Sequence, residues 1–306
     1  MSSFSIWQPL RTVIGTRKHS PSLALARNGQ HRVQPISGGK ADITLASGGH
    51  SVNVPMNLLS NTDIIGPGTL TAGNIVNTAT LSIQTNVLAA NVDGSGTTTV
   101  AAGKSFTAAR IRQSALIADG SIRILPGRST TRTSIVGTLD LHAAAQLDLG
   151  DNDLIVDYSG ASPLMNVRQQ ILSGVIFSSV AATDLSKGVG YGDTSDLGAG
   201  SYSGESLDAS AVVIRFTSKG DADLNGIVDS LDFSRFVGGY GINTNALWTQ
   251  GDFTSDGKVN SLDFNFLAGN FGVLVASPAL GAVVPEPVSV GVLAALGLMI
   301  RRGRNR

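Results

Sequence analysis

The fold is decided by a series of short segments that alternate between apolar and polar residues: Ile43-Thr-Leu-Ala, Ser51-Val-Asn-Val, Gly68-Thr-Leu-Thr, Ala79-Thr-Leu-Ser-Ile, Thr97-Thr-Thr-Val, Ser121-Ile-Arg-Ile-Leu, Thr138-Leu-Asp-Leu and Asp153-Leu-Ile-Val-Asp-Tyr. Alternation at a period of two gives each strand one inward and one outward face. Many short strands at turn-sized intervals predict a β-solenoid, with a β-sandwich as the alternative.

Composition supports a mainly β protein. The 306 residues include 37 glycines, and Glu205 and Glu286 are the only glutamates among 22 acidic residues. Abundant Thr, Ser, Asn and Gly favour turns and strands over helices. We therefore expect a β-rich body over residues 42–218.

Other chemistry is excluded or disfavoured by what the chain lacks. Cysteine is absent, so disulfides, thiolate metal sites and cysteine nucleophiles are excluded together. The four histidines include no pair at zinc-binding spacing. A net charge of zero gives no electrostatic case for nucleic acid.

Two regular elements are expected late in the body. A serine before a proline, apolar residues at helical spacing and a closing glycine predict a short helix near 163–173. The apolar run Ala211-Val-Val-Ile-Arg-Phe predicts a strand that leads directly into an acidic segment at Asp221.

The strongest signal in the sequence is an internal repeat. Residues 220–241 and 251–272 match at ten of 22 positions, with an offset of 31 residues. The two copies contain Asp221-Ala-Asp-Leu-Asn-Gly-Ile-Val-Asp-Ser-Leu-Asp232 and Asp252-Phe-Thr-Ser-Asp-Gly-Lys-Val-Asn-Ser-Leu-Asp263. Each copy therefore contains a twelve-residue loop with glycine at position 6 of the loop.

Such a loop predicts a calcium site, because Ca²⁺ prefers six to eight oxygen ligands supplied from positions 1, 3, 5, 7, 9 and 12. Copy one offers Asp221, Asp223, Asn225, the carbonyl of Ile227, Asp229 through water and Asp232, around Gly226. Copy two offers Asp252, Thr254, Asp256, the carbonyl of Lys258, Asn260 and Asp263, around Gly257. The uncharged Thr254 predicts a weaker second site.

A helix is expected after each loop, since apolar residues recur there at helical spacing. They are Phe233, Phe236, Val237 and Tyr240 in copy one, and Phe264, Leu267, Ala268 and Phe271 in copy two. We expect the two helices to pack against each other through these faces, with both loops exposed.

Residues 219–272 resemble the dockerin module, in which paired EF-hand-like loops carry Asp at position 12 and the helix before the first loop is missing. The resemblance implies that calcium orders a small helical module, which then binds a cohesin-like partner. It places the partner contacts at loop positions 10 and 11, which are Ser230, Leu231, Ser261 and Leu262. Well-known members carry Ser-Thr there, so leucine leaves the identity of the partner open.

The two ends of the chain are basic. Residues 1–41 contain six Lys or Arg and no acidic residue, and we expect a basic leader, with a disordered tail as the alternative. After a linker at 273–283, residues 284–306 contain Pro285, Glu286 and Pro287, an apolar run that predicts a hydrophobic helix, and an end with four arginines.

This tail resembles the PEP-CTERM sorting signal, which directs exported proteins to a sorting enzyme at the membrane. The resemblance implies an extracellular or cell-surface protein that is transiently anchored through its C-terminal helix. The β-strand body before the loops resembles the bodies of planctomycete-type surface proteins, which implies a setting but no activity.

Three functions remain open. The first is a non-catalytic surface protein with a calcium-dependent docking module. The second is an enzyme acting on polysaccharide, for which the body offers Asp148, Asp151, Asp153 and Asp157 as paired acids and Arg110, Arg112 and Arg123 for a lyase. The third is a structural envelope or matrix component. Turn composition accounts for the aspartates without catalysis, so we expect no enzyme.

Overall fold

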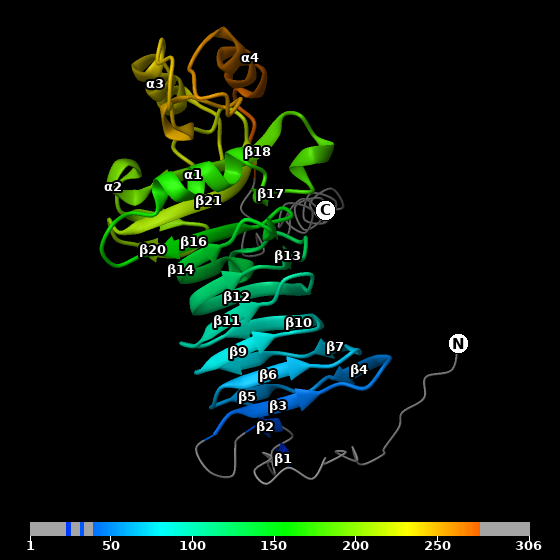
Figure 1. The fold of residues 1–306 in the computed structure, drawn as a ribbon. Coiled ribbons are helices and arrows are strands. Elements are labelled where there is room, and N and C mark those ends of the chain that lie inside the picture. The colour runs from blue at the N-terminus through cyan, green and yellow to red at the C-terminus, as the bar shows by residue number, and fades with distance from the viewer. Residues whose placement is uncertain (1–22, 26–30, 34–38, 276–306) are drawn as a thin grey trace, which may run out of the picture.

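The computed structural model describes residues 23–25, 31–33 and 39–275, and it shows short strands stacked into a tall β-solenoid of about six turns (Figure 1). The predicted mainly β architecture is confirmed, and the body is a β-solenoid rather than the alternative β-sandwich. The tail with Pro285, Glu286 and Pro287, and its predicted helix, lie outside the described residues.

Three parallel stacks of strands form the solenoid walls. The first stack contains β3 (Ala41–Thr44), β6 (Thr62–Ile65), β9 (Thr80–Ile83), β11 (Thr97–Val100) and the ends of β12 (Ser105–Ala118) and β14 (Ser134–Leu141). The second contains β4 (Gly49–Val52), β7 (Thr69–Ala72), the starts of β10 (Asn86–Asp93) and β12, β13 (Ser121–Ile124), β15 (Gln146–Asp148) and β17 (Ile176–Phe177). The third contains β2 (His31–Val33), β5 (Met56–Leu58), β8 (Ile75–Asn77), the end of β10, the middle of β12, the start of β14 and β16 (Asp153–Asp157). β1 (Leu23–Leu25) pairs antiparallel with β2.

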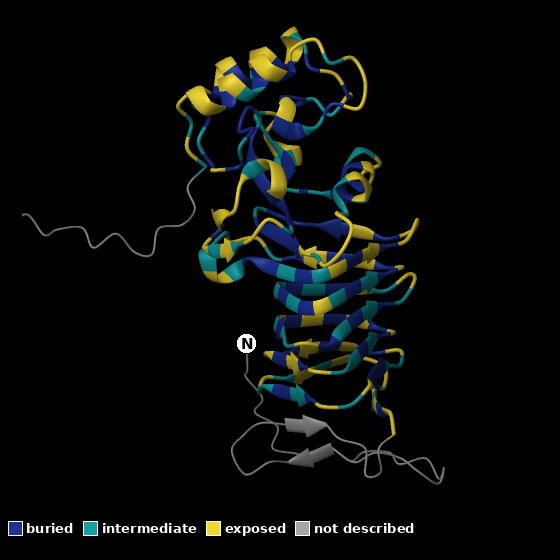
Figure 2. Cartoon of the chain, turned by 90° about the vertical axis from the view of Figure 1, so that its left-hand side faces the viewer, coloured by how far each residue is buried: buried dark blue, intermediate teal, exposed yellow. Residues whose placement is uncertain are grey.

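The core consists of ladders of apolar side chains that repeat from turn to turn. One ladder runs through Leu70, Val87, Phe106, Ile122, Leu147 and Ile176, all paired in register and buried. Figure 2 shows buried and exposed residues alternating along the strands. The period-two pattern therefore places every second residue inside, where burial of apolar surface stabilises the stack.

Successive turns differ in length, which explains why the sequence shows no strict period. Thr80 pairs with Thr97, 17 residues later, whereas Ser121 pairs with Gln146, 25 residues later. Loops absorb the extra residues while the ladder registers are kept. The longer turns include a 3₁₀ turn, η1 (Thr130–Arg132).

Antiparallel strands end the solenoid. β21 (Ala211–Ser218) pairs with β16 on one side and with β18 (Lys187–Asp193) on the other, and all eight of its residues are buried. This covers the open edge that a parallel stack would otherwise present. Further elements of this end are α1 (Leu164–Leu172), η2 (Ala181–Thr183), α2 (Thr194–Leu197) and the hairpin of β19 (Gly200–Tyr202) and β20 (Glu205–Leu207).

α1 occupies the segment predicted as a helix, but it begins at Leu164 with Pro163 as its N-cap rather than with Ser162. The Ser162 hydroxyl donates to Asp193 instead, and it accepts the N–H of Leu164 at 3.2 Å. The serine thus links the helix start to β18.

The last described part of the chain sits on the capped end of the solenoid (Figure 1). It contains α3 (Ser230–Gly239), η3 (Trp248–Gln250) and α4 (Ser261–Asn270). Residue 218 ends β21, and the first acidic loop starts at Asp221, so almost no chain separates this part from the solenoid. None of the helices in the described part of the chain is long and apolar enough to span a membrane.

Candidate metal centre and docking face

The two acidic loops, Asp221–Asp232 (loop one) and Asp252–Asp263 (loop two), share one backbone conformation. Gly226 and Gly257, at position 6 of each loop, have φ values of 96° and 79°. Leu224 and Ser255, at position 4, both have φ of 59°, although neither is glycine. Non-glycine residues rarely adopt the left-handed backbone conformation. Its recurrence at position 4 of both loops therefore shows that the two loops share the same defined turn.

Each loop leads into a helix through a reciprocal cap. Asp229 accepts from the N–H of Leu231 at 2.7 Å, and Asp232 accepts from the N–H of Asp229 at 2.7 Å. Asn260 and Asp263 make the equivalent bonds at 2.8 and 2.9 Å. These capping boxes satisfy donors that a helix start leaves open, and they fix the position 12 carboxylates beneath the loops.

Three carboxylates converge in loop one. Ligand atoms of Asp221, Asp223 and Asp232 all lie within 4.8 Å of one another, and this is the one such acidic trio that residues 39–275 contain. Asp221 is fully buried, and its Oδ1 has no hydrogen-bond partner among the described residues. A buried carboxylate oxygen without a partner is costly, so the site fits a bound cation.

Burial raises the pKa of Asp221 to about 7 and the pKa of Asp232 to about 6. Removal from water disfavours the charged form, and the neighbouring carboxylates act in the same direction. A divalent cation would reverse both effects, because it supplies positive charge where these groups lack it.

The other predicted ligands of loop one lie around this trio. Asp223 accepts the N–H of Asn225 at 3.0 Å, and Asn225 Oδ1 accepts the N–H of Ile227 at 2.8 Å. Ile227 forms a bridge with Leu274, but the hydrogen bonds of that bridge are made by Gly226 and Val228 on either side. The Ile227 carbonyl therefore stays outside the bridge.

Loop two has the same layout with fewer charges. Asp252 accepts the N–H of Asp256 at 3.1 Å and that of Gly257 at 2.8 Å, and burial raises its pKa to about 6. The Oγ1 of Thr254 is buried without a hydrogen-bond partner in the described part of the chain. This hydroxyl stands where loop one has Asp223, as a predicted neutral ligand would. Lys258 is exposed, and its N–H binds Asp256 at 2.9 Å.

Paired loops of this kind, each followed by a short helix, define a calcium-binding helical module. Residues 219–271 match the family of the dockerin type I domain. Dockerin type I domains bind Ca²⁺, so the predicted cofactor is confirmed. The domain implies calcium-dependent docking to cohesin in an extracellular complex. No curated protein matches the chain, and no solved structure matches it.

The predicted packing of the two helices is only partly right. Phe236 and Leu267 are buried, and the rings of Phe236 and Phe264 lie 5.8 Å apart. The remaining apolar residues of both helices are exposed, because the helices lie side by side on the module rather than enclosing all of these residues. They are Phe233, Val237, Tyr240, Phe264, Ala268 and Phe271.

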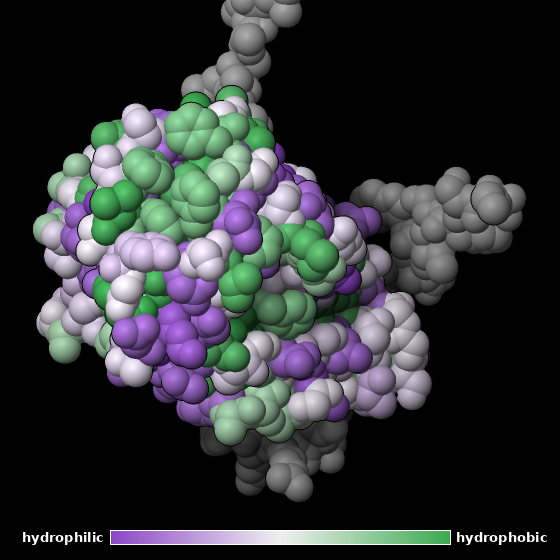
Figure 3. Space-filling view, turned by 90° about the horizontal axis from the view of Figure 1, so that it is seen from above, coloured by the Kyte–Doolittle hydropathy of each residue, from purple (hydrophilic) through white to green (hydrophobic). Residues whose placement is uncertain are grey.

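The four residues at the predicted partner positions are exposed at the starts of α3 and α4. Leu231 is 61% exposed and Leu262 is 57% exposed, and Ser230 and Ser261 precede them. Together with the six exposed apolar residues of the two helices, they form the candidate docking face. Figure 3, which looks down on this end of the molecule, shows hydrophobic side chains gathered beside a hydrophilic patch.

The candidate acids of the body are held in structural contacts. Asp148 accepts the N–H groups of Gly150 and Ser179 at 2.9 Å each. Asp151 accepts the N–H of Gly127 at 2.8 Å. Asp153 pairs with Arg128 at 2.9 Å. Asp157 alone is exposed at a strand end.

The candidate lyase arginines are paired as well. Arg110 binds both oxygens of Asp93 at 3.1 and 2.8 Å. Arg112 pairs with Glu205, and Arg123 lies 3.5 Å from Asp148. Arg110 and Arg112 lie on the same strand, β12, and Arg123 lies on β13. Arg123 therefore contacts one candidate acid, Asp148, while Arg112 lines a surface depression together with Asp157.

Sequence reasoning missed the residues at the contact between loop one and the body. They are Arg215 and Thr217 on β21, and Trp248 of the module, whose ring lies against Gly188 and Gly190 of β18. One signal was present: Arg215 interrupts an otherwise apolar strand. A charged residue in a buried strand requires a specific partner.

Proposed function

We propose that this chain is an exported, surface-displayed, non-catalytic protein whose solenoid carries a dockerin module that binds a cohesin-like partner in the presence of calcium. Calcium fixes the two loops, and the loops fix the helices that carry the docking face. The solenoid acts as a spacer that holds this face at its end.

One observation carries the proposal. The exposed apolar residues of the docking face lie on the two helices that the calcium loops cap, and at the positions predicted for partner contact. Large apolar residues clustered on an exposed face mark an interaction surface. Leucine at position 11 of both loops favours a partner with an apolar surface rather than one read through hydrogen bonds.

The absence of catalysis is part of the proposal. Three of the four candidate acids accept hydrogen bonds from backbone N–H groups or pair with arginine, and these structural roles account for them without catalysis. The rival enzyme would need two free carboxyl groups about 5 to 10 Å apart in one groove.

Polysaccharide binding by the body is a second candidate. An open depression of about 460 Å³ on the solenoid wall is lined by polar side chains that include Asp93, Arg112, Gln113 and Asp157. Such groups can hydrogen-bond sugar hydroxyls. Binding of a surface glycan, lost in Asp157→Ala, would support it, and no binding across acidic and neutral glycans would remove it.

The proposal extends to the C-terminal tail. Pro285, Glu286 and Pro287 would serve as the sorting motif read by an enzyme at the membrane, and the apolar run would be a transient anchor. The intact mass of protein from native cell fractions tests this. A chain shortened from about Val288 and found outside the cytoplasm supports sorting, whereas full-length chain from cytosol alone contradicts it.

Docking is tested by surface plasmon resonance of the full chain against type I cohesin modules, with calcium and with a chelator. Leu231→Asp with Leu262→Asp should weaken binding at least about tenfold, because it places charge in an apolar interface. The matched control is Leu185→Asp, since Leu185 is 80% exposed on the body. Binding that survives the chelator or the double variant would contradict the proposal.

A further inference from the structure

The docking module is fastened to the solenoid by buried polar groups rather than by a linker. Arg215, on the capping strand β21, is only 2% exposed. Its Nη1 donates to the carbonyl of Leu224 in loop one at 2.6 Å. Its Nε lies 3.8 Å from Asp153 Oδ2 at the start of β16. One side chain thus joins the last parallel turn of the solenoid to the backbone of the calcium loop.

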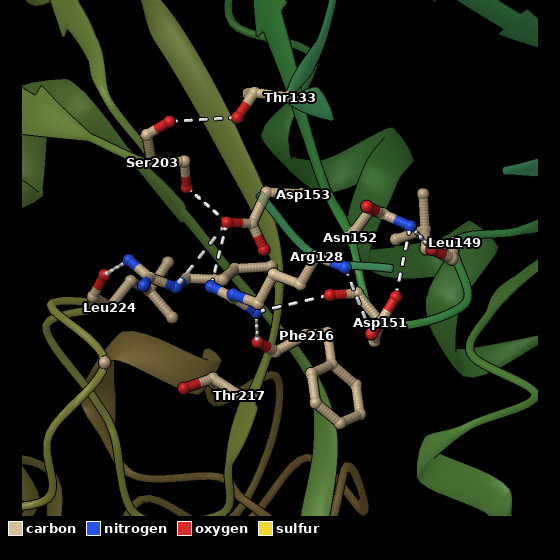
Figure 4. A network of polar contacts seen from close by, with 12 residues as sticks. Arg128, Thr133, Leu149, Asp151, Asn152, Asp153, Ser203, Phe216, Thr217 and Leu224 are labelled. Atoms are coloured by element: carbon tan, nitrogen blue, oxygen red, sulfur yellow. Dashed lines mark hydrogen bonds and ion pairs between the residues drawn. The ribbon is translucent and has the colours of Figure 1, made fainter. Parts of the chain in front are cut away.

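Asp153, which lies beside Arg215, is itself contacted by several other groups (Figure 4). Arg128 lies 2.9 Å from the same Asp153 oxygen and donates to the Phe216 carbonyl at 2.6 Å. The hydroxyl of Ser203 also donates to Asp153. The contacts of Arg128, Ser203 and Arg215 all converge on Asp153 Oδ2, and such a buried network restricts its members to one arrangement.

Two more groups reach the position 1 ligand, Asp221. Thr217, on β21, donates its hydroxyl to Asp221 Oδ2, the oxygen that also accepts the N–H of Gly226 at 3.1 Å. Trp248 donates its indole N–H to the Asp221 carbonyl at 2.7 Å. Because Thr217 and Gly226 both donate to Oδ2, the unpartnered Oδ1 of Asp221 is left to face a cation.

Glycines on β18 allow the module to lie directly against the solenoid backbone. A Cβ at Gly190 would come within 2.6 Å of Leu224 Cδ2 and 2.8 Å of Trp248 Nε1. A Cβ at Gly188 would lie 3.0 Å from the Trp248 ring. Leu224 and Trp248 are fully buried in this contact. Close approach of this kind requires glycine.

We infer that the body completes the calcium site of loop one: Arg215 and Thr217 are positioning residues for it, and the capping strands β18 and β21 fold as one cooperative unit with the docking module. Calcium binding in loop one therefore also stabilises the end of the solenoid, and the docking face is held in a fixed direction relative to the solenoid. This inference rests on calcium binding by the module.

The first test isolates each loop in the full chain. Asp252→Ala leaves loop one as the calcium site, and Asp221→Ala leaves loop two. In the first background Thr217→Val should weaken calcium binding about tenfold, because outer partners that orient a ligand contribute tenfold or more to metal affinity. In the second background it should change nothing. Thr71→Val, on an exposed face of β7, is the matched control.

The second test is hydrogen–deuterium exchange of the full chain with and without calcium. Calcium should slow exchange in residues 187–193 and 211–218 as well as in the loops. Gly190→Ala should remove this protection from the body strands, whereas Gly200→Ala should keep it, because a Cβ there meets its nearest atom, on Tyr202, at 3.9 Å.

Protection confined to residues 219–275 would overturn the inference, as would an unchanged loop-one affinity in Thr217→Val. Both results leave calcium binding itself intact. A wild-type chain that binds no calcium would instead contradict the metal site from which the proposed function starts.

Discussion

Loop one and loop two have the same pattern, the same backbone turn and the same helix cap, yet they sit in different surroundings. Loop one is closed against the solenoid, and its position 4 residue, Leu224, is buried. Loop two approaches the body at Gly257, where a Cβ would lie 3.3 Å from Arg168 Nη2 on α1, but its position 4 residue, Ser255, is partly exposed. Both hydrogen bonds to the Asp252 carboxylate among the described residues come from loop two itself. A ligand pattern therefore predicts a site, while packing decides how far it is formed in advance.

The difference in charge between the two loops also favours tighter calcium binding in loop one. Loop one has four carboxylates, at positions 1, 3, 9 and 12, whereas loop two has three, at positions 1, 5 and 12, with Thr254 and Asn260 at positions 3 and 9. Calcium affinity rises with the charge and rigidity of its ligands. We therefore expect loop one to be the tighter site.

The largest expected effect compares Asp221→Ala with Thr254→Ala. Loss of an ionised, buried ligand should weaken loop one by more than about a hundredfold, whereas loss of a neutral hydroxyl should weaken loop two by roughly a few-fold. Competition with a chromophoric chelator measures both. Equal losses would show that the two loops are not ranked by their ligands.

Acid should separate the loops next. Protons compete with calcium for the ionised carboxylates, so from pH 7.5 to 5.5 affinity should fall about a hundredfold in loop one, through Asp221 and Asp232, and about fourfold in loop two, through Asp252. Calorimetry on the single-loop variants gives both numbers.

Without calcium, acid should have the opposite effect, since it should stabilise the folded module. Because these folded-state pKa values are raised, the calcium-free module should gain stability as pH falls from about 7 towards 4. Parallel pH profiles of the two loops would contradict the difference in burial.

The position 4 residues give a stability comparison. Leu224→Ala should lower the free energy of unfolding by about 2 to 5 kcal/mol, because it leaves a cavity against β18. Ser255→Ala should change it by less than about 0.5 kcal/mol. Chemical denaturation of calcium-free chain measures both values, and a small effect for Leu224→Ala would mean that loop one is not packed on the body.

The smallest effect sharpens the ligand argument. Thr254→Asp adds the missing carboxylate and should tighten loop two several-fold, to about the range of loop one. Calorimetry in the Asp221→Ala background isolates the change. An unaltered affinity would show that the position 3 side chain does not face the ion.

Much of the fold and site followed from local patterns. Period-two alternation predicted the solenoid because each strand faces one core, and the spacing of oxygen ligands predicted both loops. The ladders stayed hidden because loops of unequal length separate partners such as Ser121 and Gln146.

What failed depends on contacts that no local pattern contains. Helical spacing defined an apolar face for α3 and α4, but it could not say that Val237 and Phe271 remain uncovered. The bond from Arg215 to Leu224 joins two elements whose orientation only the folded end of the solenoid determines.

The most direct test of this account is calorimetric titration of the full chain with calcium at pH 7.5. We predict two bound ions of unequal affinity, with the tighter event removed by Asp221→Ala and the weaker one by Asp252→Ala. No heat at millimolar calcium, two indistinguishable sites, or a tighter event that survives Asp221→Ala would contradict it.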